Sequence, residues 1–115
     1  MDGRPQRKVA DYLLTSLGVR NLDSITTAGT VRHLSETTDQ TATLMANLHV
    51  SVKGHGSRRI AVVAHHDCLD NPVSDKTQRD QLEAAVRRGR DLYPDAEVLS
   101  LCVNEQWIIE RVTVP

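Results

Sequence analysis

The feature that most constrains this chain is an apolar run, Ile60 to Ala64, that stops abruptly on His65, His66, Asp67 and Cys68. A short apolar run rich in β-branched residues is typical of a strand buried on both faces, as in a parallel sheet. Open α/β sheets bind their ligands at the C-terminal ends of such strands. The sequence therefore predicts a functional site where this strand stops.

The spacing of His65 and Cys68 is suited to a metal. An imidazole and a thiolate three residues apart, where the chain leaves a strand, are able to reach one tetrahedral zinc ion. The pair supplies only two ligands, and one buried thiol beside one exposed imidazole gives the same pattern. His66 and Asp67 lie in the same turn, either as groups that orient the ligands or as ordinary polar turn residues. Spacing alone leaves both interpretations open.

Length and composition set wider limits. With 115 residues, we expect one domain that spans residues 1–115. The formal net charge of -1 gives no field that would favour nucleic acid or an anionic membrane, so neither partner is expected. No apolar stretch approaches the roughly 20 residues that cross a bilayer, and the first residues lack a signal-peptide pattern. We therefore expect a cytoplasmic protein.

Hydrophobic periodicity predicts alternating helices and strands. Helices are expected at residues 6–17, at 30–52 with a break near 37–41, and at 75–92, and strands at 22–26, 60–64, 97–103 and 106–114. Alternation of this kind favours right-handed crossovers. The expected fold is a three-layer α/β fold, in which a mostly parallel sheet has helices on both faces.

Capping residues and weak helix formers set the expected boundaries. Gly18 is placed to end the first helix. Asp75 followed by Gln78 is a capping signature that should begin the last helix. The threonines around residues 37–43 are mediocre helix formers, which is why a break is expected there.

Two further segments place the strand-end motif in a wider context. Residues 2–4 (Asp-Gly-Arg) open the chain, and residues 26–29 (Thr-Thr-Ala-Gly) lie between them and the motif at 64–68 (Ala-His-His-Asp-Cys). In this order the segments resemble the β-class carbonic anhydrase family. That family carries Cys-x-Asp-x-Arg at the end of its first strand, Asn-Ala-Gly after its second, and Gly-His-x-Asp-Cys at the end of a later strand. The resemblance covers nearly the whole chain, from Met1 to about Trp107.

This resemblance implies a function. The family consists of zinc-dependent carbonate dehydratases, lyases in which zinc-bound hydroxide converts carbon dioxide reversibly to bicarbonate. By the resemblance, His65 and Cys68 would be zinc ligands. Asp2 would accept a hydrogen bond from the hydroxide or ligate zinc in a resting form, and Arg4 would pair with Asp2 and hold it away from the metal. A homodimer or higher homo-oligomer, with the active site at the subunit boundary, is also implied.

The chain departs from the family at its start. The family's first cysteine ligand would stand one residue before Met1, at the end of a strand that the resemblance places between the strands at 22–26 and 60–64. We therefore expect a sheet that lacks its first, central strand, although unpaired backbone groups cost about 1 to 3 kcal/mol each. The two strands could pair directly, another chain could fill the gap, or this chain is a shortened form of a longer protein. We favour a start assigned too far downstream.

Several functions stay open. With the first cysteine missing, we expect this chain to bind zinc weakly and to hydrate carbon dioxide poorly. One alternative is a non-catalytic carbonic anhydrase-like binding or assembly protein, and another is a zinc hydrolase of carbonyl sulfide or carbon disulfide. A redox thiol at Cys68, activated by His65, ranks last because no second cysteine stands at Cys-x-x-Cys spacing. Cys102 lies in an alternating apolar strand and is expected to be a buried apolar residue rather than the third ligand.

Overall fold

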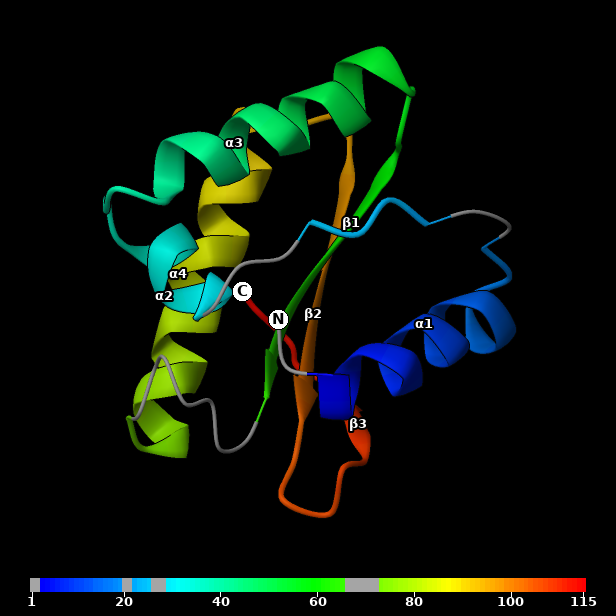
Figure 1. Cartoon of the computed structure of the whole chain (residues 1–115), viewed down its shortest axis with the longest axis vertical. Helices are drawn as coiled ribbons and strands as arrows, with labels where there is room; N and C mark the ends of the chain where they lie inside the picture. The colour runs from blue at the N-terminus through cyan, green and yellow to red at the C-terminus, as the bar shows by residue number, and fades with distance from the viewer. Residues whose placement is uncertain (1–2, 20–21, 26–28, 66–72) are drawn as a thin grey trace.

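The chain folds into an α/β arrangement of helices around a three-stranded sheet (Figure 1). The computed structural model describes residues 3–19, 22–25, 29–65 and 73–115. The elements are α1 (Gly3–Ser16), α2 (Thr30–Ser35), α3 (Thr41–His49), the π-helical turn η1 (Val50–Gly54), β1 (Arg59–His65), α4 (Asp75–Leu92), β2 (Glu97–Val103) and β3 (Ile109–Arg111). None of the helices in these ranges is long and apolar enough to cross a membrane.

The sheet has the order β1-β2-β3. Strands β1 and β2 run parallel over their whole length, from Arg59 opposite Glu97 to His65 opposite Val103. Strand β3 runs antiparallel to β2. The α/β class and the strands predicted at 60–64 and 97–103 are thus confirmed. The sheet of the described residues is small and mixed, however, rather than mostly parallel.

A tight hairpin explains why the last strand is antiparallel and shorter than the predicted 106–114. The Asn104 side-chain oxygen accepts hydrogen bonds from the backbone N–H groups of Gln106, at 2.9 Å, and Ile108, at 3.0 Å. Trp107 takes up the left-handed backbone conformation, with φ 59°. A connection this short can join only antiparallel strands, since a parallel crossover needs about a dozen residues or more.

The strand predicted at 22–26 is wrong for residues 22–25, which form no regular element; Thr26 lies outside the described residues. Side-chain bonds hold this connector instead. The Asp23 carboxylate accepts a hydrogen bond from the Ser51 hydroxyl at 2.8 Å and lies 2.7 Å from the His55 ring. Residues 22–25 therefore do not pair directly with β1. Within the described parts of the chain, β1 has a ladder partner on one side, which is β2.

Helix α4 covers one face of the β1–β2 pair and forms the core with it. The helix begins at Asp75, as predicted, but its N-cap is Ser74 rather than Asp75: Ser74 has the extended backbone that an N-cap needs, and its hydroxyl accepts from the Thr77 N–H at 3.1 Å. The helix and its following turn bury residues at helical spacing: Leu82, Ala85, Val86, Gly89 and Tyr93. The strands contribute Val62, Ala64, Val98 and Cys102 to the same core.

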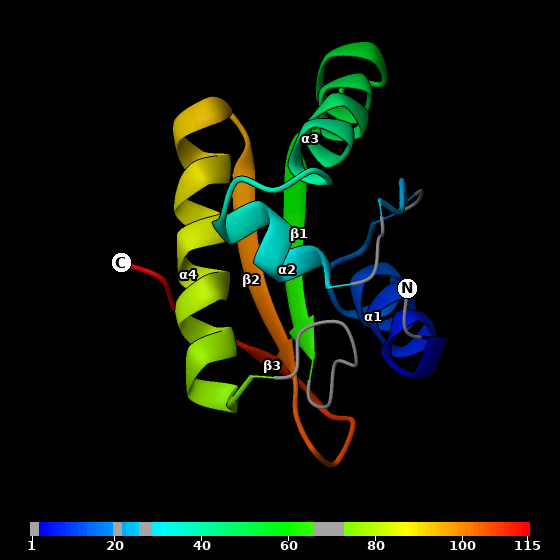
Figure 2. The same ribbon diagram turned by 60° about the vertical axis from the view of Figure 1, so that its left-hand side comes forward.

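Helix α1 lies on the other side of the strands from α4 (Figure 2). It begins at Gly3 rather than residue 6, and Gly18 follows its end with φ 65°, as expected of a C-terminal cap. Two bonds link it to the sheet region. Lys8 Nζ donates to the Trp107 carbonyl at 3.3 Å, and Arg59 Nη1 donates to the Leu17 carbonyl at 3.2 Å.

The break predicted in the helix at 30–52 is confirmed, and the threonines build it. Thr41 Oγ1 donates to the His33 carbonyl at 2.6 Å and accepts from the Thr38 N–H at 2.8 Å. The His33 ring, which is buried, lies 2.5 Å from Thr38 Oγ1. Polar side chains therefore satisfy the backbone where α2 stops and α3 starts. The helix then continues through η1 to Gly54.

Truncating the core should destabilise the fold far more than truncating the surface. Leu82 is 0% exposed in the core, so Leu82→Ala should lower the free energy of unfolding by about 2 to 5 kcal/mol, measured by chemical denaturation. Leu14→Ala is the matched control, because Leu14 is 40% exposed on α1 and should cost well under half as much. Equal losses for the two variants would contradict the assignment of the core.

Candidate functional site

The site predicted at the end of the apolar strand has one residue whose side chain the structure describes, and this residue is His65. This residue ends β1 and lies opposite Val103, the last residue of β2. Its side chain is half-buried. Because β1 and β2 are parallel, both strands end at the same edge of the sheet, which is where α/β sheets place their ligands. The predicted position of His65, at the C-terminal end of an apolar parallel strand, is thus confirmed.

The other predicted site residues cannot be placed around His65. Asp2 and Cys68 lie outside the described residues, as do His66 and Asp67. Arg4 belongs to the first turn of α1, and its side chain is also outside the described part. The structure therefore neither assembles nor separates the four residues predicted to act together.

Cys102 does not belong to this site. It lies opposite Ala64 on β2, one position before the residue opposite His65. Side chains of successive strand residues point to opposite faces of a sheet, so the Cys102 thiol and the His65 ring lie on different faces. The thiol is buried in the core beneath α4. The expectation that Cys102 is a buried apolar residue is confirmed.

The predicted site residues have donor atoms of the types that zinc binds. The number of these residues is smaller than a zinc site needs. Imidazole nitrogen, thiolate sulfur and carboxylate oxygen are the ligands that zinc takes in proteins. Residues 3–19, 22–25, 29–65 and 73–115 contain no group of three or more His, Cys, Asp or Glu side chains arranged to hold a metal ion. A complete ligand set therefore needs the side chains of residues outside these ranges.

A second polar cluster, which sequence analysis missed, lies at the other end of β1. Asp23 Oδ2 accepts from the Ser51 hydroxyl and lies beside His55 Nδ1, and the Ser51 and Ser57 hydroxyl oxygens are 2.8 Å apart. These hydrogen bonds, that of His55 first and that of Ser51 second, lower the pKa of Asp23 below its ordinary value of 3.8. His55 thus has a defined partner in Asp23.

The geometry of this cluster is structural rather than catalytic. A serine nucleophile needs a base that accepts its proton, normally a histidine. Here Ser51 donates to the carboxylate of Asp23, and His55 contacts the same carboxylate oxygen. The cluster therefore fastens the connector at 22–25 to the end of η1, from which the chain enters β1.

Comparison with models of protein families gives a match, over residues 1–113, to a family described as "Putative carbonic anhydrase". The chain belongs to this family. The match includes residues 2–4 and the strand-end motif, so the predicted carbonic anhydrase-like relationship is confirmed. No curated protein and no solved structure gives a significant match.

In this carbonic anhydrase-like chain, the two polar sites lie at opposite ends of one strand. The Asp23 cluster holds the helical turn that precedes Arg59, the first residue of β1, and His65 is its last residue. Fixing the start of a strand restricts the position of its end. The cluster therefore supports the strand that carries the candidate ligand.

The Asp23 cluster should make stability depend on pH in the acid range. Because the folded-state pKa of Asp23 is lowered, its carboxylate stabilises the fold above the unfolded-state pKa, and this contribution is lost as the pH falls through the folded-state pKa. Asp23→Asn should therefore lower the melting temperature at neutral pH. Wild type and variant should converge as the pH falls below 3.8. The measurement is thermal unfolding followed by circular dichroism across this pH range.

Asp95→Asn is the matched control for this experiment. Asp95 is exposed in the turn that precedes β2 and makes no hydrogen bond or ion pair with another residue of the described ranges. Its variant should follow the wild type at every pH. A pH-independent difference between Asp23→Asn and wild type would show that the carboxylate charge does not stabilise the cluster.

Proposed function

We propose that this chain carries the active-site residues of a zinc-dependent carbonate dehydratase, which interconverts carbon dioxide and bicarbonate. The observation that carries the proposal is the family match over residues 1–113, which includes the motif whose histidine ends β1. The substrate is a small molecule. Other parts of the proposal are a cytoplasmic location, a single domain over residues 1–115, and assembly into a homodimer or larger homo-oligomer.

His65 and Cys68 are the proposed zinc ligands. When bound, zinc lowers the pKa of a coordinated water molecule to about 7, which supplies a nucleophile at neutral pH. His65 is suited to ligation because the backbone of β1 holds it at the sheet edge. Asp2 would accept a hydrogen bond from this nucleophile, or serve as a third ligand in a resting form. Arg4 would pair with Asp2 through two parallel hydrogen bonds and so keep the carboxylate away from the metal.

The ligand set is one cysteine short of the family pattern. Two strong ligands and one carboxylate hold zinc weakly, so we propose that a segment preceding Met1 supplies both the cysteine and a strand beside β1. The one-sided ladder of β1 in the described residues supports this, because the free side has backbone groups able to pair with another strand. With that strand, the sheet would become mostly parallel and approach the expected three-layer form.

Zinc content is the direct test of this proposal. A protein extended to the next upstream start in the same frame should bind about one zinc per chain, whereas the 115-residue chain should hold much less. In the extended protein, Cys68→Ser should remove most of the zinc. Cys102→Ala is the matched control and should retain it, because Cys102 lies in the core beneath α4. Elemental analysis after gel filtration measures all four proteins.

The same proteins separate the competing functions. Stopped-flow hydration of carbon dioxide by the zinc-loaded extended protein supports the dehydratase. Zinc without hydration of carbon dioxide, but with hydrolysis of carbonyl sulfide or carbon disulfide, would reassign the substrate. Equal zinc content in the short and extended chains, or a stop codon directly upstream of Met1, would contradict the proposed completion of the site.

A further inference from the structure

The hairpin that joins β2 to β3, residues 104–108, begins at the edge of the sheet where β1 ends. It directly follows Val103, the residue of β2 opposite His65. Side chains alternate between the faces of a strand, so the His65 ring lies on the face away from α4. Leu101 and Val103 share this face and are both 0% exposed. Helix α1 lies on this side of the strands (Figure 2), so α1 and the His65 ring are on the same face of the sheet.

The side chain of Asn104 organises the hairpin. Its oxygen accepts from two backbone N–H groups within the hairpin, and its Nδ2 donates to Glu110 Oε1 of β3 at 2.9 Å. Glu110 Oε2 in turn accepts from Arg79 Nη2 of α4 at 3.3 Å. Both ends of the Asn104 amide are thus bonded within the protein. These bonds tie the hairpin to β3 and to α4.

Trp107 has an unfavourable backbone conformation for a bulky residue. Its φ of 59° lies in the left-handed region, which side chains larger than glycine rarely adopt. Backbone strain of this kind persists where the surrounding structure enforces it, and it often marks a functional element. Here the Trp107 N–H donates to the Asn104 carbonyl at 2.9 Å, and the Trp107 carbonyl accepts from Lys8 Nζ of α1 at 3.3 Å. The strained residue therefore links the hairpin to α1.

Helix α1 depends on contacts of this kind. It has 14 residues, and an isolated helix of about this length is only marginally stable in water. Its side chains at residues 6–16 are all half-buried or exposed. The Lys8 bond lies in the first half of the helix, and the bond from Arg59 to the Leu17 carbonyl lies just after its end. Lys8 comes one turn after Arg4, so the bond to Trp107 holds the start of the helix.

We propose that Lys8 and Asn104 are positioning residues of the candidate site, which fasten the start of α1, through the Trp107 carbonyl, to the sheet edge where His65 lies. The fastening matters because Asp2 precedes α1 and Arg4 belongs to its first turn. A helix start held at this edge, and on the face of the His65 ring, keeps residues 2–4 near the end of β1. The roles of Asp2 and Arg4 rest on the proposed function, whereas the fastening of α1 does not.

Hydrogen exchange in the 115-residue chain, without metal, tests the fastening. Lys8→Met removes the donor, so the amides of α1 should exchange about three- to tenfold faster while those of α4 keep their rate, as measured by mass spectrometry. Asn104→Ala should accelerate exchange in α1 in the same way, although it lies outside the helix. Lys8→Arg retains a donor and should restore the wild-type rate.

Arg7→Met is the matched control. It removes one positive charge from the same helix, but Arg7 is exposed and pairs with Asp11 within α1, at 4.0 Å. Its exchange should match the wild type. Trp107 is the single tryptophan of the chain, so its fluorescence reports on the hairpin. Lys8→Met should make this fluorescence easier to quench with acrylamide, and Arg7→Met should not.

Turnover tests whether the fastening serves the site. In the extended, zinc-loaded protein, Lys8→Met should lower kcat for hydration of carbon dioxide about three- to tenfold at unchanged zinc content, because small misplacements of reacting groups slow a reaction strongly. Lys8→Arg should restore kcat, and Arg7→Met should leave it unchanged.

Three results are decisive against the proposal or its basis. Wild-type exchange and quenching in Lys8→Met would overturn the fastening. Faster exchange in α1 with unchanged kcat per zinc would overturn the positioning role. If the zinc-loaded wild type hydrates no carbon dioxide, the proposed function fails, but exchange in Lys8→Met and Asn104→Ala still decides whether these residues fasten α1.

Discussion

The parallel pairing of β1 with β2 is the constraint on which the rest of the structure depends. Parallel neighbours need a long connection, and α4 provides it while covering the face of the pair with Leu82 and Val86. The same pairing brings the C-terminal ends of the two strands to one edge, with His65 beside Val103. The packing that stabilises the core therefore also determines where the candidate metal ligand lies.

Sequence was sufficient where the structure depends on local periodicity. The buried side of α4, the two parallel strands and the break before Thr41 all follow from residue types at fixed spacing. The sequence was insufficient to predict segments whose conformation depends on contacts with residues far away in the chain. Residues 22–25 were predicted to form a strand, but a strand needs a neighbour, and Asp23 is bonded to side chains instead. The antiparallel β3 likewise follows from a turn that the Asn104 side chain organises.

The polar residues at the two ends of β1 also differ in whether the sequence could predict them. His65 could be located from the apolar run that ends on it, because strand ends are where α/β sheets place their chemistry. The Asp23 cluster could not, since Asp23 and Ser51 are 28 residues apart and no spacing rule joins them. A ligand set distributed between the chain start and the end of β1 is equally non-local. The ordered family motifs, rather than physical periodicity, connect Asp2 and Arg4 to His65.

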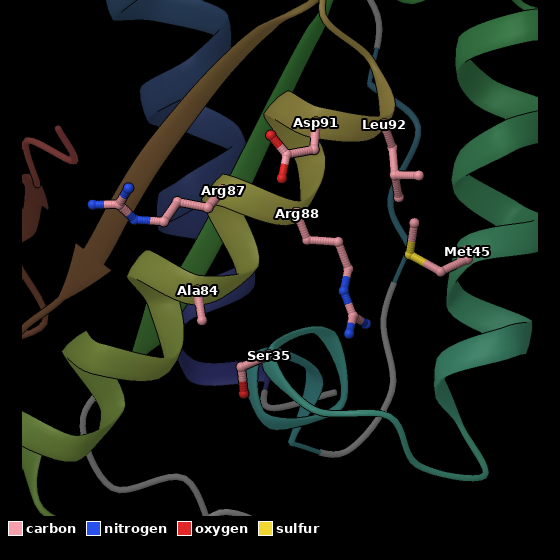
Figure 3. Close-up of a pocket in the computed structure, with 7 residues that line it drawn as sticks. All are labelled: Ser35, Met45, Ala84, Arg87, Arg88, Asp91 and Leu92. Atoms are coloured by element: carbon pink, nitrogen blue, oxygen red, sulfur yellow. The ribbon is translucent and has the colours of Figure 1, made fainter.

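Two surfaces of the described chain are incompletely covered, and they have different requirements. Among the described residues β1 has a ladder partner on one side, which is β2, and an edge of a strand pairs with another strand in a defined register. The groove between α3 and α4 (Figure 3) has a mixed lining, with Arg87, Arg88 and Asp91 beside Met45, and presents side chains rather than unpaired backbone groups. A strand cannot satisfy the groove, and a helical surface cannot complete the ladder of β1. The edge of β1 and the groove between α3 and α4 therefore differ in what each can bind, the first a strand and the second side chains.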